Sequence, residues 1–159
     1  MNDRSAAEIV AEYSLAPHPE GGWYREIFRS ARTVQPMDGR PARAGLTSID
    51  FLLTRGQQSA WHRVRSDEAW HWLEGGPLRL WLLPPSLGEL GEVTLHAAGE
   101  RRHVVPADWW QAAEPLGDFA YVGASVGPGF DFADFSFGRD DASLRQALQQ
   151  HAAGLQRLL

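Results

Sequence analysis

The chain has no cysteine, no lysine and no long apolar run. Without cysteine, disulfides, thiolate catalysis and cysteine-ligated metals are excluded. Every basic residue is arginine, which we interpret as coding bias and not as a sign of function. No apolar stretch approaches the roughly 18 residues that span a bilayer, and the polar N-terminal segment predicts no secretory signal. The formal net charge of −5 argues against a nucleic-acid partner. We therefore expect a cytoplasmic protein that binds neither nucleic acid nor membrane.

Glycine and proline, with 16 and 10 copies, lie between short apolar runs throughout the 159 residues. This distribution predicts many turns and an all-β body. We expect one domain over residues 1–159, with a barrel core at about 20–137. Helix signals occur only near the ends, and they predict short helices at about 5–14 and 141–158. The polar segment Thr33–Ala44 is predicted to be the longest loop.

Between these helices the apolar pattern changes to a period of two, which is typical of β-strands. Turn residues such as Gly75-Gly76-Pro77 separate the runs. The predicted strands are Trp23–Ser30, Thr47–Thr54, Ala60–Val64, Ala69–Leu73, Leu78–Leu83, Val93–Ala97, His103–Val105, Trp109–Ala113, Phe119–Val126 and Phe130–Phe137. Short antiparallel strands at this spacing predict a sandwich or a closed barrel.

The segment Gly56–Gly75 carries the most informative polar residues of the chain. Residues two apart on a strand share a face, so His62 and Val64 point the same way. A turn then leads into a strand whose residues Glu68 and Trp70 share one face. The hairpin is therefore expected to place the imidazole of His62 and the carboxylate of Glu68 opposite each other inside a barrel.

The spacing of this segment resembles the first motif of the cupin superfamily, with Gly56, His62, Glu68 and Gly75 at matching positions and Val64 where a second His stands. A second cupin motif is matched by Pro106, whereas Asp108 replaces a Gly and Gln111 replaces a His. Three further segments resemble the small single-domain cupin-5 branch, whose function is uncharacterised. They are the run Pro17–Tyr24, the strand Thr47–Leu53, and the run Val126–Phe132 with Phe135.

The resemblance implies an RmlC-like antiparallel jelly-roll β-barrel with a short helix at each end. It also implies a homodimer and one small ligand at the mouth of the barrel. The cupin metal site normally has three His and one Glu. Here it is reduced to His62, Glu68 and the amide of Gln111. A neutral amide binds transition metals far more weakly than imidazole, so no metal cofactor is favoured.

Three functions remain open. The first is a metal-independent epimerase or isomerase of a sugar-like or nucleotide-sugar-like carbonyl compound, with His62 as base and Glu68 as its orienter or as the acid. The second is a non-catalytic binding module for a small metabolite, and the third is a metal-dependent cupin of the dioxygenase type. In the first two, Gln111, Trp70 and Arg25 are the candidate substrate-binding residues. Three further histidines, His18, His96 and His103, have no potential partner at a spacing that would predict a shared site. They are expected on the surface or in turns.

Overall fold

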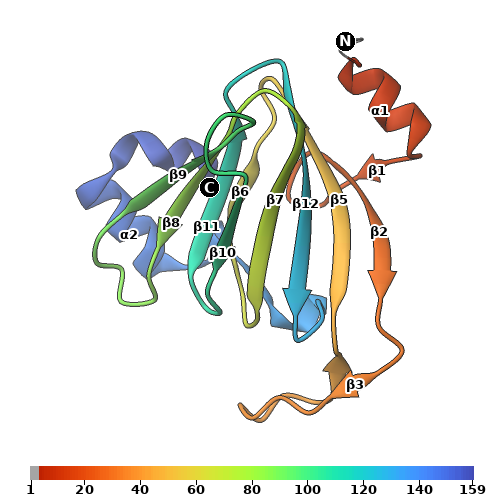
Figure 1. The fold of residues 1–159 in the computed structure, drawn as a ribbon. Helices are drawn as coiled ribbons and strands as arrows, with labels where there is room; N and C mark the ends of the chain where they lie inside the picture. The colour runs from red at the N-terminus through yellow and green to blue at the C-terminus, as the bar shows by residue number, and fades with distance from the viewer. Residues whose placement is uncertain (1–3) are drawn as a thin grey trace.

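The computed structural model describes residues 4–159, and two antiparallel sheets form its body (Figure 1). The six-stranded sheet has the order β1-β2-β5-β12-β7-β10. Its strands are β1 (Ala16–Pro17), β2 (Trp23–Arg29), β5 (Thr47–Thr54), β12 (Phe119–Gly127), β7 (Asp67–Gly75) and β10 (Arg102–Val105). The five-stranded sheet has the order β13-β6-β11-β8-β9. Its strands are β13 (Phe135–Phe137), β6 (Ser59–Val64), β11 (Trp110–Pro115), β8 (Leu78–Leu83) and β9 (Gly91–Leu95). This is the cupin, or jelly-roll, sandwich that the sequence predicts.

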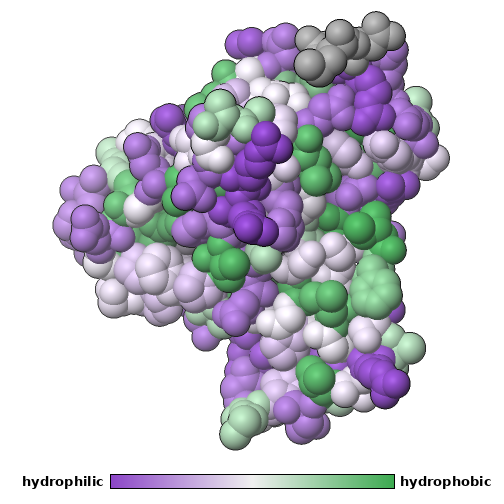
Figure 2. All heavy atoms as spheres, in the orientation of Figure 1, coloured by the Kyte–Doolittle hydropathy of each residue, from purple (hydrophilic) through white to green (hydrophobic). Residues whose placement is uncertain are grey.

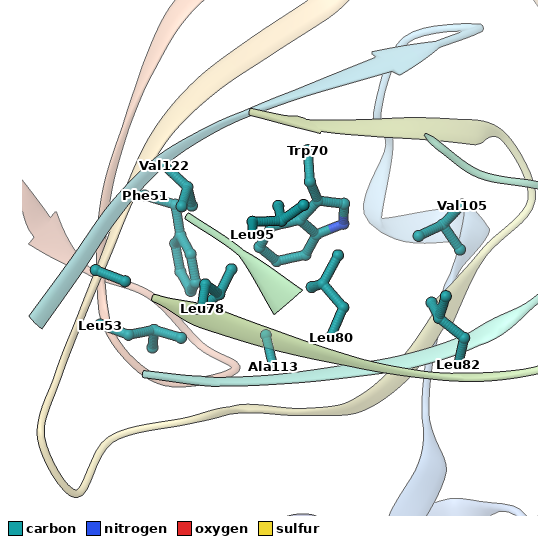
Figure 3. Packing of buried hydrophobic residues seen from close by; sticks show 11 residues of the cluster. Phe51, Leu53, Trp70, Leu78, Leu80, Leu82, Leu95, Val105, Ala113 and Val122 are labelled. Carbon is teal, nitrogen blue, oxygen red and sulfur yellow. The ribbon is translucent and has the colours of Figure 1, made fainter. Parts of the chain in front are cut away.

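The main core lies between the two sheets, as Figure 3 shows for Phe51, Trp70 and Leu80. It forms because inward-facing positions alternate along each strand, as in β8, where Leu78 and Leu80 are fully buried. Each large side chain taken from water into such a core contributes about 1.5–3 kcal/mol. The interface between the sheets is therefore the main source of stability.

Short helices cover the outer surfaces of both sheets. Helix α1 (Ala6–Glu12) begins at Ser5, whose side chain and that of Glu8 form a capping box. It places Ile9 against Leu52 and Tyr121 of the six-stranded sheet. Helix α2 (Ala142–His151) packs on Trp61 of the five-stranded sheet through Leu144 and Leu148. None of the helices in residues 4–159 has the length and apolar character needed to cross a membrane.

Two predictions near the C-terminus need correction. The expected helix over 141–158 is interrupted at Ala152, and the 3-10 helix η3 (Ala153–Leu158) follows. The expected strand Phe130–Phe137 begins instead with the 3-10 helix η1 (Phe132–Asp134). The cause is Asp131, whose side chain accepts a hydrogen bond of 2.8 Å from the backbone N–H of Ala133. A second 3-10 helix, η2 (Gly138–Asp140), joins β13 to α2.

The segment predicted as the longest loop contains the hairpin β3 (Thr33–Val34) and β4 (Arg43–Ala44), at the bottom of Figure 1. Its anchor is the carboxylate of Asp134, which accepts hydrogen bonds of 2.9 Å from Arg40 and Arg43. The side chains of Arg40 and Asp134 are 4 % and 2 % exposed, so this is a buried ion pair. It fastens the hairpin to η1.

The outer face of the six-stranded sheet carries a mixture of polar and apolar residues (Figure 2). Exposed apolar side chains in the strands of this sheet are Ile27, Phe28, Leu73 and Val104. The expected homodimer stays a prediction, since the structure describes a single chain.

Candidate functional site

A cavity of about 420 Å³ lies between the two sheets, where the interior changes from apolar to polar. Along β7, the apolar side chains of Trp72 and Trp70 pack in the core, and Glu68 is the next residue on the same face. The apolar interior therefore ends at a carboxyl group. Polar residues of the cavity wall are His18, Glu20, Glu26, Arg29, Thr47, His62, Glu68 and Asp131. Its volume suits one small molecule.

His62 enters the cavity from β6 and is 2 % exposed. Its Nδ1 lies 2.7 Å from the carbonyl oxygen of Ala60 and 3.4 Å from Oε2 of Glu20. A carbonyl oxygen only accepts, so Nδ1 carries the hydrogen and Nε2 of the neutral ring is left as an acceptor. The ring also stacks on Phe135, with centroids 5.3 Å apart. These contacts fix the orientation of the imidazole.

Glu20 reaches His62 from the turn between β1 and β2. The turn is held against the start of β6, because the backbone oxygen of Glu20 accepts from the N–H of Ala60 and its Oε1 accepts from the hydroxyl of Ser59 at 2.8 Å. The approach requires glycine at position 21, where φ is +108° and a Cβ would lie 2.1 Å from the backbone oxygen of Gln58.

Glu68 lies on the opposite sheet from His62 and is 8 % exposed. Burial raises the pKa of Glu68 to about 7, although the neighbouring His62 and a hydrogen bond from Gln111 act in the opposite direction. That bond joins Nε2 of Gln111 to Oε2 of Glu68 at 2.8 Å. Near neutral pH this carboxyl group is therefore both a donor and an acceptor of protons.

The structure brings His62 and Glu68 into one cavity, but it does not bring Gln111, Trp70 or Arg25 to the cavity wall. Gln111 lies behind Glu68, and its Oε1 accepts a hydrogen bond of 2.8 Å from Nε1 of Trp70. Trp70 is 2 % exposed and packs in the main core. Arg25 is paired with Asp50 outside the barrel, with Nε 2.9 Å from Oδ2. Gln111 therefore orients Glu68, Trp70 holds Gln111 in place, and Arg25 lies away from the site.

The sequence interpretation missed several cavity residues, among them Glu20 as a partner of His62 and His18 as part of the wall. His18 lies in a turn as expected, but its side chain is only 9 % exposed, and burial lowers its pKa. Its Nδ1 accepts from the backbone N–H of Glu20 at 3.1 Å. The run Pro17–Tyr24 signalled the turn, yet spacing alone gave no register between Glu20 and His62, which lie 42 positions apart in the chain.

The donor set does not fit a catalytic metal. Within residues 4–159, no group of three His, Cys, Asp or Glu side chains is arranged to hold a metal ion. Val64 offers no ligand atom, and Gln111 uses its amide oxygen on Trp70 and its amide nitrogen on Glu68. His62 and Glu68 alone fall short of the three protein ligands that such a site usually needs.

A two-sheet antiparallel barrel with this polar cavity defines a protein of the cupin fold. The chain belongs to the Cupin_5 family, described as "Cupin superfamily (DUF985)", whose model matches residues 7–138. The search of curated proteins found no match.

Among solved structures, a hypothetical protein from Leishmania major is 28 % identical with a TM-score of 0.87, and the match covers 98 % of each chain. A protein from Shewanella oneidensis is 33 % identical with a TM-score of 0.84, covering 98 % of this chain and 97 % of that one. An oxalate decarboxylase of Bacillus subtilis is 18 % identical with a TM-score of 0.57, over 77 % of this chain and 29 % of the other. The last likeness shows the fold alone.

Proposed function

We propose that this protein binds a small polar carbonyl compound in the barrel and catalyses an epimerisation or isomerisation by proton transfer. The observation that carries the proposal is the free Nε2 of His62 in a cavity whose opposite wall holds Glu68. A general base must present an unprotonated acceptor to its substrate, and in the neutral ring the contact between Nδ1 and Ala60 leaves Nε2 as that acceptor.

The two side chains have complementary roles. Nε2 of His62 takes a proton from the carbon next to the carbonyl, so that a C–H bond breaks, an N–H bond forms and the carbonyl becomes an enolate. Glu68 supplies a proton from the other wall of the cavity to the same carbon of the enolate, which restores the carbonyl. Its pKa of about 7 makes the protonated form available near neutrality. Glu20 stabilises the imidazolium that forms, because its Oε2 lies 3.4 Å from Nδ1. Glu20, and not Glu68, is the orienting carboxylate in this proposal.

The test is exchange of substrate hydrogen with solvent deuterium. A panel of aldoses, ketoses and 2-keto acids is incubated with the protein in D₂O, and the signal of the hydrogen next to the carbonyl is followed by NMR. At least one compound should lose this signal faster than in buffer alone. His62→Asn should slow the exchange by about 100-fold or more, the smaller end of general-base effects. The Asn amide nitrogen can still donate to Ala60.

The matched control is His151→Asn, because His151 is exposed in α2 and lies away from the cavity. It should exchange at the wild-type rate. Saturable binding of panel members without exchange above the buffer rate would contradict catalysis and leave the barrel as a binding module.

A further inference from the structure

The cavity wall carries more negative than positive charge. Besides Glu20 and Glu68 it includes the carboxylates of Glu26 and Asp131, whereas Arg29 is the one arginine of the wall in residues 4–159. Nε of Arg29 lies 2.6 Å from Oε1 of Glu26, so these two charges compensate each other. The other three carboxyl groups of the wall are those of Glu20, Glu68 and Asp131. No arginine of the wall is paired with them.

The nearby arginines are bound to other carboxylates, although Arg43 also interacts electrostatically with Asp131. Arg40 and Arg43 are bound to Asp134, and Arg25 is bound to Asp50. None of the three contributes to the cavity wall. Walls of low dielectric strengthen the attraction of such a cavity for a positive charge.

A second, independent observation concerns Glu68. The side chain is 8 % exposed, and Gln111 donates to its Oε2 only. Within the part of the chain that the structure describes, no side chain donates a hydrogen bond to Oε1. Oε1 is therefore open to the cavity, where a ligand group that donates hydrogen bonds can reach it.

Aromatic rings complete the wall. Phe130, Phe132 and Phe135 lie edge to face, with centroids 4.9 to 6.2 Å apart, and Tyr24 contributes a fourth ring. Aromatic faces attract organic cations, and more strongly where water is excluded. Carboxylates and aromatic rings together favour an ammonium group over a neutral or anionic one.

From these contacts we infer that the molecule held in this cavity carries an organic ammonium group, with Glu20 and Asp131 as its counter-charges and Glu68 as a hydrogen-bonding neighbour. This rests on the proposed function in using the same cavity, and it narrows the substrate class from polar carbonyl compounds to those that bear an amine, such as amino sugars. Nucleotide sugars, with their negative diphosphate, are disfavoured by the same charges.

The test compares molecules of one shape and different charge. The protein is titrated with glucosamine, glucose and glucuronate, and separately with cyclohexylamine, cyclohexanol and cyclohexanecarboxylate, while NMR follows the indole and backbone signals. In each set the ammonium compound should bind at least tenfold more tightly than the neutral one, and the carboxylate should bind most weakly. Equal or tighter binding of a neutral or anionic member in both sets, or no binding of either amine at tens of millimolar, would overturn the inference.

A variant that removes one negative charge tests whether Asp131 is a counter-charge of the bound amine. Asp131→Asn retains an oxygen that can accept from Ala133 and removes one negative charge, so it should weaken binding of the tighter amine about threefold to tenfold and leave its neutral analogue unchanged. Asp118→Asn is the control, because Asp118 is exposed and paired with Arg55 away from the cavity. An Asp131 variant that behaves like the Asp118 variant would contradict the role of Asp131.

Failure here and failure of the proposed function give different results. If neutral compounds bind better but still exchange hydrogen through His62, the catalytic proposal stands and the ammonium inference falls. If amines bind tightly and no compound exchanges hydrogen, the reverse holds.

Discussion

Glu20 and His62 form a dyad across the polar end of the barrel, with Oε2 of Glu20 3.4 Å from Nδ1 of His62. Glu20 lies in the turn between β1 and β2 of the six-stranded sheet, and His62 lies on β6 of the five-stranded sheet. The backbone bond from Ala60 to Glu20 brings them together. The dyad leaves Nε2 of His62, a residue of the cavity wall, as the acceptor that a base needs.

Glu20→Gln tests the positioning role of the carboxylate. The amide keeps an oxygen for the hydroxyl of Ser59, but it removes the charge that stabilises the imidazolium. The exchange rate should fall at least about tenfold, and the NMR exchange assay measures it. Ser59→Ala keeps the charge and should exchange at close to the wild-type rate. A Glu20→Gln variant that exchanges as fast as wild type would contradict the dyad.

Glu68→Gln tests the raised pKa of Glu68 through stability. A carboxyl group whose pKa rises from 4.5 to about 7 on folding contributes stability that is complete below pH 4.5 and is lost as the pH rises through 7. Gln has no such loss, so the variant should gain up to about 3 kcal/mol relative to wild type between pH 4.5 and pH 8. Urea unfolding at both pH values measures the difference, and an equal difference at both would show that the pKa is not raised.

Val64→His combined with Gln111→His tests the account of the metal site. Val64 lines the cavity, and both positions are those at which the cupin motifs carry histidine. The double variant should bind Co²⁺ with a visible absorption band and at least about tenfold greater affinity than wild type, since two imidazoles join His62 and Glu68. Val64→Thr with Gln111→Asn is the control without imidazole. Binding of similar affinity by wild type, or no gain in a folded double variant, would contradict this account.

Asp134→Asn tests the anchor of the β3–β4 hairpin. Removing the charge takes away the buried counter-charge of Arg40 and leaves only Asp38, which is 42 % exposed, so it costs about 3–5 kcal/mol of unfolding free energy. The hydrogen bonds of Arg40 and Arg43 keep the pKa of Asp134 below its usual value, so the variant should also lose the part of the acid sensitivity that this group causes as the pH falls. Urea unfolding measures both effects. A loss no larger than that of the exposed control Asp140→Asn would contradict the assignment.

Much of the fold follows from local patterns. The bounds of β5 and β8 agree with the predicted Thr47–Thr54 and Leu78–Leu83, because a period of two and flanking turn residues specify a strand locally. The side-chain direction of His62 and Glu68 follows from the same period. Trp61, adjacent to His62, accordingly lies on the outer face under α2.

The rest of the site depends on contacts that spacing does not encode. Glu20 reaches His62 through a turn whose register is set by tertiary packing, and Gln111 faces Glu68 with both ends of its amide already bonded. The buried pair of Arg40 and Asp134 joins residues 94 positions apart, so the intervening polar segment resembled an ordinary loop. Long-range pairing of this kind is visible only in the folded chain.

The most direct test of the central claim is the tautomer of His62, read from long-range ¹H–¹⁵N correlations of the ring near pH 8. We expect a neutral imidazole with its hydrogen on Nδ1 and an unprotonated Nε2. A ring with its hydrogen on Nε2 would direct a donor at the ligand and contradict the assignment of His62 as the base.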